Sequence, residues 1–192
     1  MQGIIANLKR HIGLTGEEEA AYLAMTRTRS IFRKHLLLQE GDVGDCQWYV
    51  QRGCLYGYEL NEKGEEHIIK FAVEDQWIAD MHSFLTGMPS RLNIQAAEDS
   101  IVVEIRRPGL EGLYRAIPQL ERFGRVHMEN AFVAMQDRLL AAISKTAEER
   151  YLDFVRQSPE LDRRLPQYMI ASYLGITPEF LSKIRKKASF LK

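Results

Sequence analysis

The stretch QYMIASYLGITPEFLSKIRKK, residues 167–187, has the pattern of two short helices joined by a tight turn. Gln167 to Leu174 predicts a two-turn helix, and Gly175 can adopt the left-handed conformation that commonly ends a helix. Thr177 then caps a second helix, and Pro178 occupies its first position, where the missing N–H is not needed. The stretch therefore predicts a helix, a three-residue turn and a second helix.

Small and apolar residues stand where a helix-turn-helix motif requires them. Counted from Gln167, Ala171 is fifth, Gly175 ninth and Leu181 fifteenth. In such a motif these positions hold a small residue at the helix crossing, a glycine in the turn and a buried apolar contact. An ordinary helical hairpin could also have a glycine in its turn. The two interpretations are therefore distinguished by the residues on the exposed face of the second helix.

The exposed face of the predicted second helix is basic toward its end. Lys and Arg also suit a helix C-terminus, so part of this charge could serve the helix dipole. However, residues 163–192 carry seven basic residues against one acidic residue, a net charge of +6, while residues 1–162 carry −6. A basic segment in a chain of zero net charge favours binding to the phosphates of nucleic acid. The residues expected to contact DNA are Gln167, Thr177, Glu179, Phe180, Ser182, Lys183, Arg185, Lys186 and Lys187.

Residues 118–144 predict one long helix, because they contain a single glycine and no proline after Pro118. A helix of this length spans about 40 Å, more than a β domain of this size can cover. We therefore expect its apolar stripe to form the seam of a homodimer, although part of the stripe could cover the chain's own β domain. A further helix is expected from Ala147 to Gln157. The stripe recurs at spacings of four, three, four and three residues and comprises Met128, Phe132, Met135, Leu139 and Ala142.

Between Ser30 and Ile105 the chain changes to short strand-forming runs separated by turn clusters such as QEGDVGD and NEKGEE. The runs are IFRKHLLL, CQWYVQ, CLYGYEL, HIIKFAV and SIVVEI. Because no long helix intervenes, they predict an antiparallel sandwich or barrel, in which NEKG joins CLYGYEL to HIIKF as a hairpin. Ahead of them, Thr15 and Glu18 form a capping box that predicts a helix from about Gly16 to Met25.

The composition fits one or two globular domains in a reducing compartment. The 192 residues are 45% hydrophobic and 27% charged, and no apolar run reaches the roughly 18 residues that a membrane helix needs. Cys46 and Cys54 cannot build a disulfide framework, and the five histidines show no zinc-module spacing. No secretory cleavage pattern follows the first residues. We expect a cytoplasmic protein without a membrane partner or a bound metal.

Taken together, these features resemble the Crp/Fnr superfamily of bacterial transcription factors, named for the catabolite activator and the fumarate/nitrate regulator. The resemblance covers nearly the whole chain and is most specific in three segments: LPQYMIASYLGITPEFLSKIRKK, LLLQEGDVGDCQWYVQRGCLYGYELNEKGEEHIIKF and SFLTGMPSRLNIQAAEDS. It implies an α+β fold with an N-terminal antiparallel β-roll of the cyclic-nucleotide-binding, jelly-roll type, a long dimerisation helix and a C-terminal helix-turn-helix domain. The corresponding domains are residues 1–117, 118–145 and 146–192. The implied partners are a palindromic double-stranded DNA operator, a second copy of the chain and, as a further candidate, RNA polymerase.

The resemblance also locates an effector pocket. In members that bind a cyclic nucleotide, a Gly-Glu-Leu-type turn opens a short helix that holds the phosphate, and an Arg followed by a small hydroxyl residue pairs with it. Here the first stretch reads IADM at 78–81, and the second pair occurs in the reverse order. Alanine lacks the freedom of glycine, and a one-residue offset in an extended segment turns a side chain to the opposite face. We expect an unidentified small effector, or none, rather than cyclic AMP, at Asp80, Met81, Ser90 and Arg91.

Relatives that hold an iron–sulfur cluster or haem use ligands that this chain supplies poorly. Two isolated cysteines do not make a cluster's ligand set, and Cys46 and Cys54 are expected to be small buried hydrophobes. His67, His82 or His127 could serve as an axial haem ligand, but lone histidines are more often structural. No cofactor is therefore expected.

The recognition helix departs from the family pattern at its start. Pro178 stands where many relatives carry an arginine, so one DNA contact is absent, whereas Glu179 and Lys183 match positions that accept from cytosine and read guanine. Two other functions remain open: a sensor or interaction module whose helix-turn-helix binds protein, and a cupin-like metalloenzyme. The enzyme would need clustered ligands, yet the chain has no His-x-His pair, nucleophile constellation or Walker loop. No catalytic residue is predicted.

Overall fold

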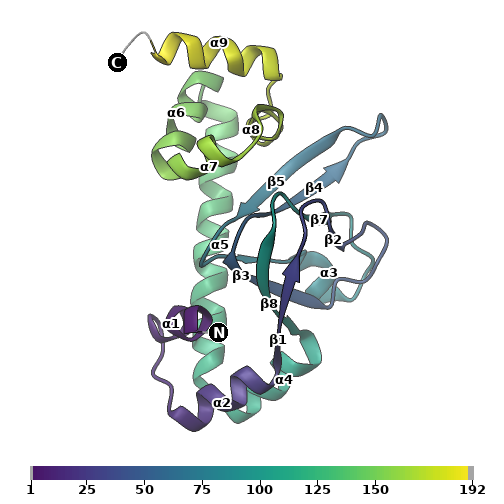
Figure 1. Cartoon of the computed structure of the whole chain (residues 1–192), viewed down its shortest axis with the longest axis vertical. Helices are drawn as coiled ribbons and strands as arrows, with labels where there is room; N and C mark the ends of the chain where they lie inside the picture. The colour runs from purple at the N-terminus through teal and green to yellow at the C-terminus, as the bar shows by residue number, and fades with distance from the viewer. Residues whose placement is uncertain (1, 190–192) are drawn as a thin grey trace. The chain divides into compact units, whose positions relative to one another are not determined.

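The computed structural model describes residues 2–189, and these residues form two compact units (Figure 1). The first unit runs to Leu60 and resumes from Ile69 to Met128, and the second takes Asn61–Ile68 and the chain from Glu129 onward. The division falls inside the long helix, which therefore contributes to both units. The three-part division at residues 117 and 145 stays a prediction.

Two four-stranded antiparallel sheets make up the β-roll, in the orders β1-β8-β3-β6 and β2-β7-β4-β5. Gly64, with φ of +77°, lies in the turn of the β4–β5 hairpin, and this hairpin confirms the one predicted around NEKG. The strands are β1 (Thr26–Ile31), β2 (Leu36–Leu38), β3 (Cys46–Arg52), β4 (Leu55–Leu60), β5 (Glu66–Ala72), β6 (Trp77–Ile78), β7 (Asn93–Ala96) and β8 (Ser100–Arg106).

One predicted strand is wrong, because it is two separate strands in the structure. The run IFRKHLLL is divided between β1, which ends at Ile31, and β2, which begins at Leu36, and the two strands belong to different sheets. Lys34 between them has φ of +68°, in the left-handed region that breaks an extended chain. The sequence pattern also missed β6 and β7, because they are short.

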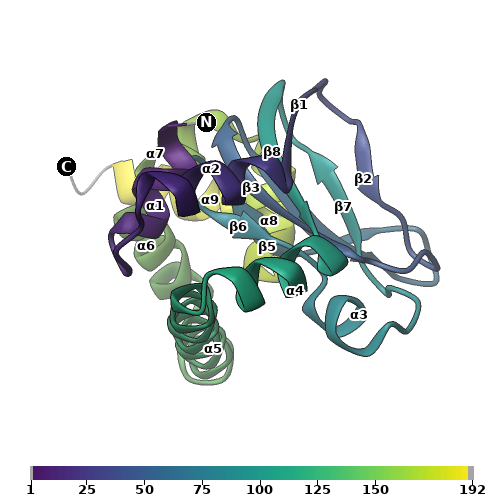
Figure 2. The ribbon, with the colours of Figure 1, turned by 90° about the horizontal axis from the view of Figure 1, so that it is seen from below.

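Strand alternation gives the sheet β1-β8-β3-β6 two buried faces. Trp48, Val50 and Val102 face the interior of the roll. Their neighbours Tyr49 and Val103 face the opposite way and pack against helices. Figure 2 shows α1, α2 and α4 on this second side, with β2 and β7 beyond the first. The helices are α1 (Gln2–Lys9), α2 (Gly16–Ala24), α3 (Met81–Thr86) and α4 (Arg107–Ala116).

Helix α2 starts as the sequence predicts. The Thr15 hydroxyl accepts a hydrogen bond from the Glu18 N–H at 3.2 Å, and the Glu18 carboxylate accepts from the Thr15 N–H at 2.8 Å. This reciprocal pair is the predicted capping box. The predicted long helix is also present as α5, Gln119–Ser144.

The second unit is a helical bundle with its own apolar core. After the later part of α5 come α6 (Ala147–Gln157), α7 (Pro159–Arg164), α8 (Gln167–Leu174) and α9 (Pro178–Ser189). The core includes Tyr151 and Phe154 of α6, Ile170 of α8, and Leu181 and Ile184 of α9, all buried. None of the helices within residues 2–189 is long and apolar enough to span a membrane.

The tip of the β4–β5 hairpin belongs to this second unit. Ser172 of α8 donates to the Glu66 carbonyl at 2.5 Å and accepts from the Ile68 N–H at 3.0 Å. Arg138 of α5 donates to the carbonyls of Ile68 and Tyr173, each at 3.2 Å, and lies over the Tyr173 ring. These hydrogen bonds tie α5, α8 and the hairpin tip together.

Candidate nucleic-acid interface

The turn between α8 and α9 has the predicted geometry. Gly175 is left-handed, with φ of 66° and ψ of 38°, and its N–H bonds back to Ala171 and Ser172. No atom lies within 4 Å of a Cβ added at Gly175, so the backbone angle rather than space calls for glycine. The Thr177 hydroxyl accepts from the Phe180 N–H at 3.2 Å and caps α9.

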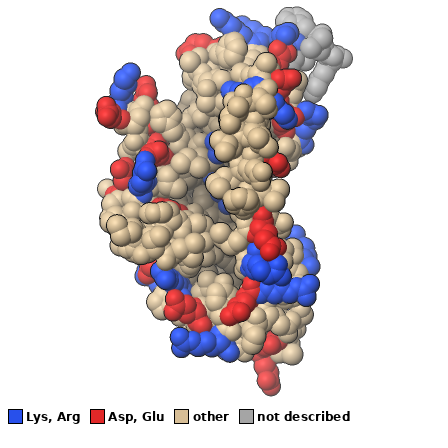
Figure 3. All heavy atoms as spheres, turned by 180° about the vertical axis from the view of Figure 1, so that it is seen from behind, with Lys and Arg blue, Asp and Glu red and all other residues tan. Residues whose placement is uncertain are grey.

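Helix α9 has a buried face and an exposed face. Leu181 and Ile184 are 0% and 5% exposed and hold the helix against the core of the second unit. Lys183 lies on the exposed face, and within residues 2–189 no hydrogen bond or ion pair engages its ammonium group. Figure 3 shows Lys and Arg side chains gathered over α9. This face can therefore meet a polyanion. Its other exposed residues are Thr177, Glu179, Phe180, Lys186 and Lys187, while Ser182 is half-buried.

Several of the predicted DNA-contacting residues, among them Arg185, Gln167 and Lys187, already have protein partners. Arg185 points inward, where Nη2 lies 2.5 Å from Asp162 Oδ1 and Nε donates to the Tyr151 hydroxyl at 3.2 Å. Gln167 Nε2 donates to the Pro178 carbonyl at 2.6 Å, which fixes the start of α9 against α8. Lys187 Nζ lies 2.8 Å from Glu148 Oε2 in an exposed ion pair. Arg185 and Gln167 thus position the motif, and their contact with DNA stays a prediction.

Glu179 also takes part in the cap of α9. Hydrogen bonds from its own backbone N–H and from the Thr177 side chain lower the pKa of the Glu179 carboxyl, so it is ionised at neutral pH. An ionised carboxylate at a helix N-terminus is favoured by the helix dipole. To accept from a base amino group, this carboxylate would have to share or exchange those capping hydrogen bonds.

The stripe on α5 is exposed to solvent in the single chain. Phe132, Met135 and Leu139 are 62%, 64% and 60% exposed, Met128 is 38% exposed, and Ala142 is exposed as well. The structure adds exposed apolar residues on α5 that the spacing of four and three residues did not include. These are Val133, Leu140 and Ile143, each more than half exposed. Apolar area of this extent on one helix indicates an interface.

Two residues of the predicted effector pocket form a closed hydrogen-bond network. Asp80 is buried and caps α3, where Oδ1 accepts from the N–H groups of His82 at 3.0 Å and Ser83 at 3.3 Å. Its other oxygen accepts from the Ser90 hydroxyl at 2.6 Å. The Ser90 oxygen in turn accepts from the Leu92 N–H at 3.0 Å. The Asp80 carboxylate therefore holds α3 against the segment before β7.

The other two predicted pocket residues lie apart from this network. The Arg91 side chain is 80% exposed and forms an ion pair with Glu59 at 2.7 Å. Met81 is half-buried and lines a separate cavity beside α4 and α5. The structure thus does not bring Asp80, Met81, Ser90 and Arg91 around one space, since the Ser-Arg order directs the guanidinium to solvent. An effector site formed by these four residues stays a prediction.

The cysteines and histidines do not form a metal site. Within residues 2–189 no group of three or more His, Cys, Asp or Glu residues could hold a metal ion. Cys46 and Cys54 are both buried, and burial together with the nearby Glu104 and Asp45 carboxylates raises the pKa of the Cys46 thiol to about 12. The described residues therefore do not fit an iron–sulfur cluster, which needs several thiolates.

The three histidines that could serve as an axial haem ligand differ in their surroundings. His67 and His82 are exposed, and His67 Nε2 lies 3.1 Å from the Asn61 amide nitrogen. His127 on α5 is half-buried and stacks on Phe123, with ring centroids 5.9 Å apart. An axial haem ligand among them stays a hypothesis.

Comparisons with known proteins agree with this architecture. Residues 28–116 match the family model of the cyclic nucleotide-binding domain. Transcriptional activator protein Anr of Pseudomonas protegens is 28% identical over 172 residues, covering 82% of this chain and 68% of that protein. The fumarate and nitrate reduction regulatory protein of Vibrio cholerae is 27% identical over 169 residues, with coverage of 82% and 67%.

Solved structures share the fold. FixK2 from Bradyrhizobium japonicum superposes with a TM-score of 0.74 at 22% identity, covering 86% of this chain and 85% of that chain. A CooA mutant from Carboxydothermus hydrogenoformans gives 0.72 at 15% identity, with coverage of 95% and 82%. Both alignments extend well beyond the β-roll, since residues 28–116 are less than half of the chain.

Proposed function

We propose that the chain is a homodimeric, sequence-specific DNA-binding regulator of the Crp/Fnr family, because its β-roll matches the cyclic nucleotide-binding domain and it is similar to Anr and to the fumarate and nitrate reduction regulatory protein. The relatives are regulators rather than enzymes. In this proposal the chain responds to an unidentified small effector other than cyclic AMP, or to none, and RNA polymerase is a candidate partner at the promoter.

The observation that carries this proposal is the geometry of α8 and α9. Leu181 and Ile184 pack helix α9 against the core of the second unit, and the Gln167 hydrogen bond fixes the start of the helix. The exposed face of α9 is therefore held as a rigid surface. A helix presented in this way fits the major groove of B-DNA. The exposed lysines of the same face supply the charge that neutralises phosphates.

The residues of α9 divide into two groups by their place along the helix. Glu179, Phe180 and Lys183 lie nearer the N-terminus, which enters the groove first, and would face base edges. Lys186 and Lys187 lie one turn further along and would contact phosphates. The Lys187–Glu148 pair does not prevent this, because an exposed ion pair contributes little and exchanges readily for a phosphate.

The exposed stripe on α5 supports the homodimer. Phe132, Met135 and Leu139 recur at coiled-coil spacing, and a second copy of the same helix would cover them. A two-fold axis along this seam gives an isologous interface and places two recognition helices symmetrically.

Selection of duplexes from a random DNA pool tests the proposal. We expect the purified chain to enrich an inverted repeat, which reports sequence preference and dimer symmetry together. Titration of a fluorescent random duplex at low and high salt should show weaker, strongly salt-dependent binding. Failure to retain any duplex at low salt would contradict DNA binding and favour a sensor or interaction module that binds protein instead.

A further inference from the structure

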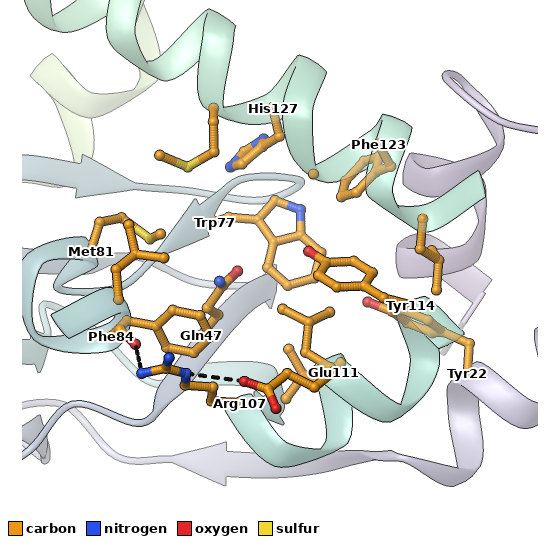
Figure 4. Close-up of a pocket in the computed structure, with 16 residues that line it drawn as sticks. Tyr22, Gln47, Trp77, Met81, Phe84, Arg107, Glu111, Tyr114, Phe123 and His127 are labelled. Atoms are coloured by element: carbon orange, nitrogen blue, oxygen red, sulfur yellow. Dashed lines mark hydrogen bonds and ion pairs between the residues drawn. The ribbon is translucent and has the colours of Figure 1, made fainter. Parts of the chain in front are cut away.

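The first unit contains an apolar cavity of about 240 Å³ that lies apart from the predicted effector residues Asp80, Ser90 and Arg91. The cavity lies on the helix-covered face of the sheet β1-β8-β3-β6, between α3, α4 and the first turns of α5 (Figure 4). Its walls are mainly aromatic and aliphatic, and include Trp77, Phe84, Ile105, Leu110, Leu120 and Phe123.

Two tyrosine hydroxyls point into this cavity without a protein partner. Tyr22 is 2% exposed, and within residues 2–189 no group hydrogen-bonds its hydroxyl. The Tyr114 hydroxyl is likewise without a hydrogen bond among the described residues and lies against Gly124. Figure 4 shows both hydroxyls directed toward the middle of the cavity. Neither oxygen is sealed from solvent, since the buried polar atoms that lack a partner within residues 2–189 are Trp48 Nε1 and Asn93 Nδ2, so a guest with a hydrogen-bonding oxygen would replace water at these hydroxyls.

The cavity offers no unpaired charge. At its rim, Arg107 Nη1 donates to the Phe84 carbonyl at 2.9 Å and Nε lies 3.3 Å from Glu111 Oε1. His127 is held between Phe123 and Trp77, with its ring centroid 6.2 Å from that of Trp77. Burial, followed by the electrostatic influence of Lys70 and His11, lowers the pKa of His127, which favours the neutral imidazole.

We propose that this cavity binds a small, neutral two-ring aromatic molecule that carries one or two hydrogen-bonding oxygens. An apolar cavity of about 150 Å³ accommodates one benzene ring, so about 240 Å³ suits a bicyclic compound. Trp77 and Phe123 would contact its rings in tilted or offset geometry. The Tyr22 and Tyr114 hydroxyls would bond its oxygen. The proposal does not depend on DNA binding.

The test uses the full chain and three probes: 2-naphthol, naphthalene and 2-naphthoate. We expect 2-naphthol to bind most tightly, because naphthalene leaves the hydroxyls unpaired and 2-naphthoate brings an unpaired charge into the cavity. Titration calorimetry gives the affinities. Trp77 lines the cavity whereas Trp48 faces the roll interior, so the quench of tryptophan fluorescence should survive in Trp48→Phe and disappear in Trp77→Phe.

Two variants locate the site within the cavity. Tyr22→Phe should weaken 2-naphthol by roughly threefold to tenfold and leave naphthalene unchanged, since it removes one hydrogen bond. Gly124→Ala should weaken both compounds, because the added Cβ would lie 2.8 Å from the Tyr114 hydroxyl and displace it. The matched control is Gly112→Ala, another helical glycine, whose added Cβ would meet only the Met25 methyl at an ordinary 3.6 Å.

Circular dichroism and melting temperature first establish that each variant is folded. The proposal is overturned if none of the three probes binds saturably, if 2-naphthol and naphthalene bind equally well, or if Gly124→Ala behaves like Gly112→Ala. DNA binding measured on the same samples separates this proposal from the proposed function, because a variant can lose binding of 2-naphthol and still bind DNA.

Discussion

Lys183 and Lys187 are both exposed lysines on α9, but they differ in position and in existing contacts. Lys183 lies nearer the helix N-terminus, and none of the described residues pairs with it. We expect Lys183→Ala to lose on the order of 1 to 3 kcal/mol on the selected operator and to relax the preference at one position in each half-site. Competition binding against operators substituted at single positions measures both effects. Equal weakening of operator and random duplex would contradict this orientation of α9.

Lys187 serves as the comparison within the same helix. Lys187→Ala removes one charge near the phosphates and leaves Glu148 without its exposed partner, a change worth little in stability. We expect it to weaken all duplexes alike and to lower the slope of log affinity against log salt by roughly one unit. The measurement is binding at four or five salt concentrations. A sequence-dependent loss would instead place Lys187 at a base edge.

Asp75 tests the role of a charge in the stability of the first unit. Its carboxylate accepts from the Asn7 amide and the Tyr49 hydroxyl, each at 2.9 Å, and from Arg10. Burial alone would raise its pKa, but these donors outweigh burial and hold the pKa below the usual Asp range. Asp75 has φ of +71°, which asparagine also tolerates, so Asp75→Asn changes the charge and keeps the backbone.

We expect Asp75→Asn to lower the free energy of unfolding at pH 7 by about 1 kcal/mol, a figure kept small because solvent screens this partly exposed side chain. A carboxyl whose pKa is lower in the folded state than in the unfolded state stabilises the folded state at pH values above its unfolded pKa. That contribution is lost as the pH falls through the folded pKa. Urea unfolding of both proteins from pH 7 into the acid range should therefore show the two stabilities converging. A difference independent of pH would contradict the role of charge.

At the scale of elements, the exposed stripe on α5 is predicted to form the dimer seam. Phe132→Glu with Leu139→Glu puts two charges into the predicted seam, where they would be desolvated without partners. We expect this double variant to be a folded monomer by light scattering. Asn130→Glu with Ala134→Glu adds the same two charges at exposed positions on the other side of the helix and should remain dimeric. A dimeric Phe132/Leu139 variant would exclude this placement of the seam.

Helix α3, its N-cap and the segment before β7 contain the residues of the predicted effector pocket. Asp80 and Ser90 are hydrogen-bonded to each other, and Arg91 is directed to solvent. We therefore expect cyclic AMP at physiological concentrations to leave the melting temperature unchanged, because a ligand that binds the folded state tightly raises it. Differential scanning fluorimetry across a cyclic AMP series is the measurement. A saturable rise that Arg91→Ala abolishes would show that Arg91 reaches the phosphate.

Elements with a local chemical signal were predictable from the sequence. The Thr15–Glu18 capping box, the glycine–threonine–proline turn before α9 and the start and end of α6 all appear where the sequence places them. Elements whose boundaries depend on tertiary pairing were not. The run IFRKHLLL looks continuous, and only pairing with β8 and β7 divides it between two sheets.

At the scale of the whole molecule, the sequence predicts local features of α9 but not the contacts that depend on long-range packing. The exposed face of α9 follows from helical periodicity, but the inward turn of Arg185 depends on Asp162, which reaches it through the packing of α7. The cavity joins Tyr22, Trp77 and His127, residues separated by up to 105 positions, and no spacing rule connects them. Long-range packing brings them together, and the sequence pattern carries no signal of it.

The last prediction concerns the geometry of the operator. Two α9 helices related by a two-fold axis in a dimer enter successive major grooves, so their half-sites should lie about 34 Å apart, one turn of the duplex. Inserting five base pairs between the half-sites places the second one on the opposite face of the DNA. Affinity should then fall by a factor on the order of 10² to 10⁴, toward that of a single half-site.

The monomeric α5 variant supplies the control for operator spacing. Because Phe132→Glu with Leu139→Glu leaves α9 intact, it should bind the original and the respaced operator equally and weakly. Electrophoretic mobility shift at constant salt compares the four combinations of protein and operator, since salt alone changes affinity strongly. If the respaced operator bound the dimer as tightly as the original, the two recognition helices would not be held by one rigid two-fold assembly, and the inverted-repeat prediction would fail.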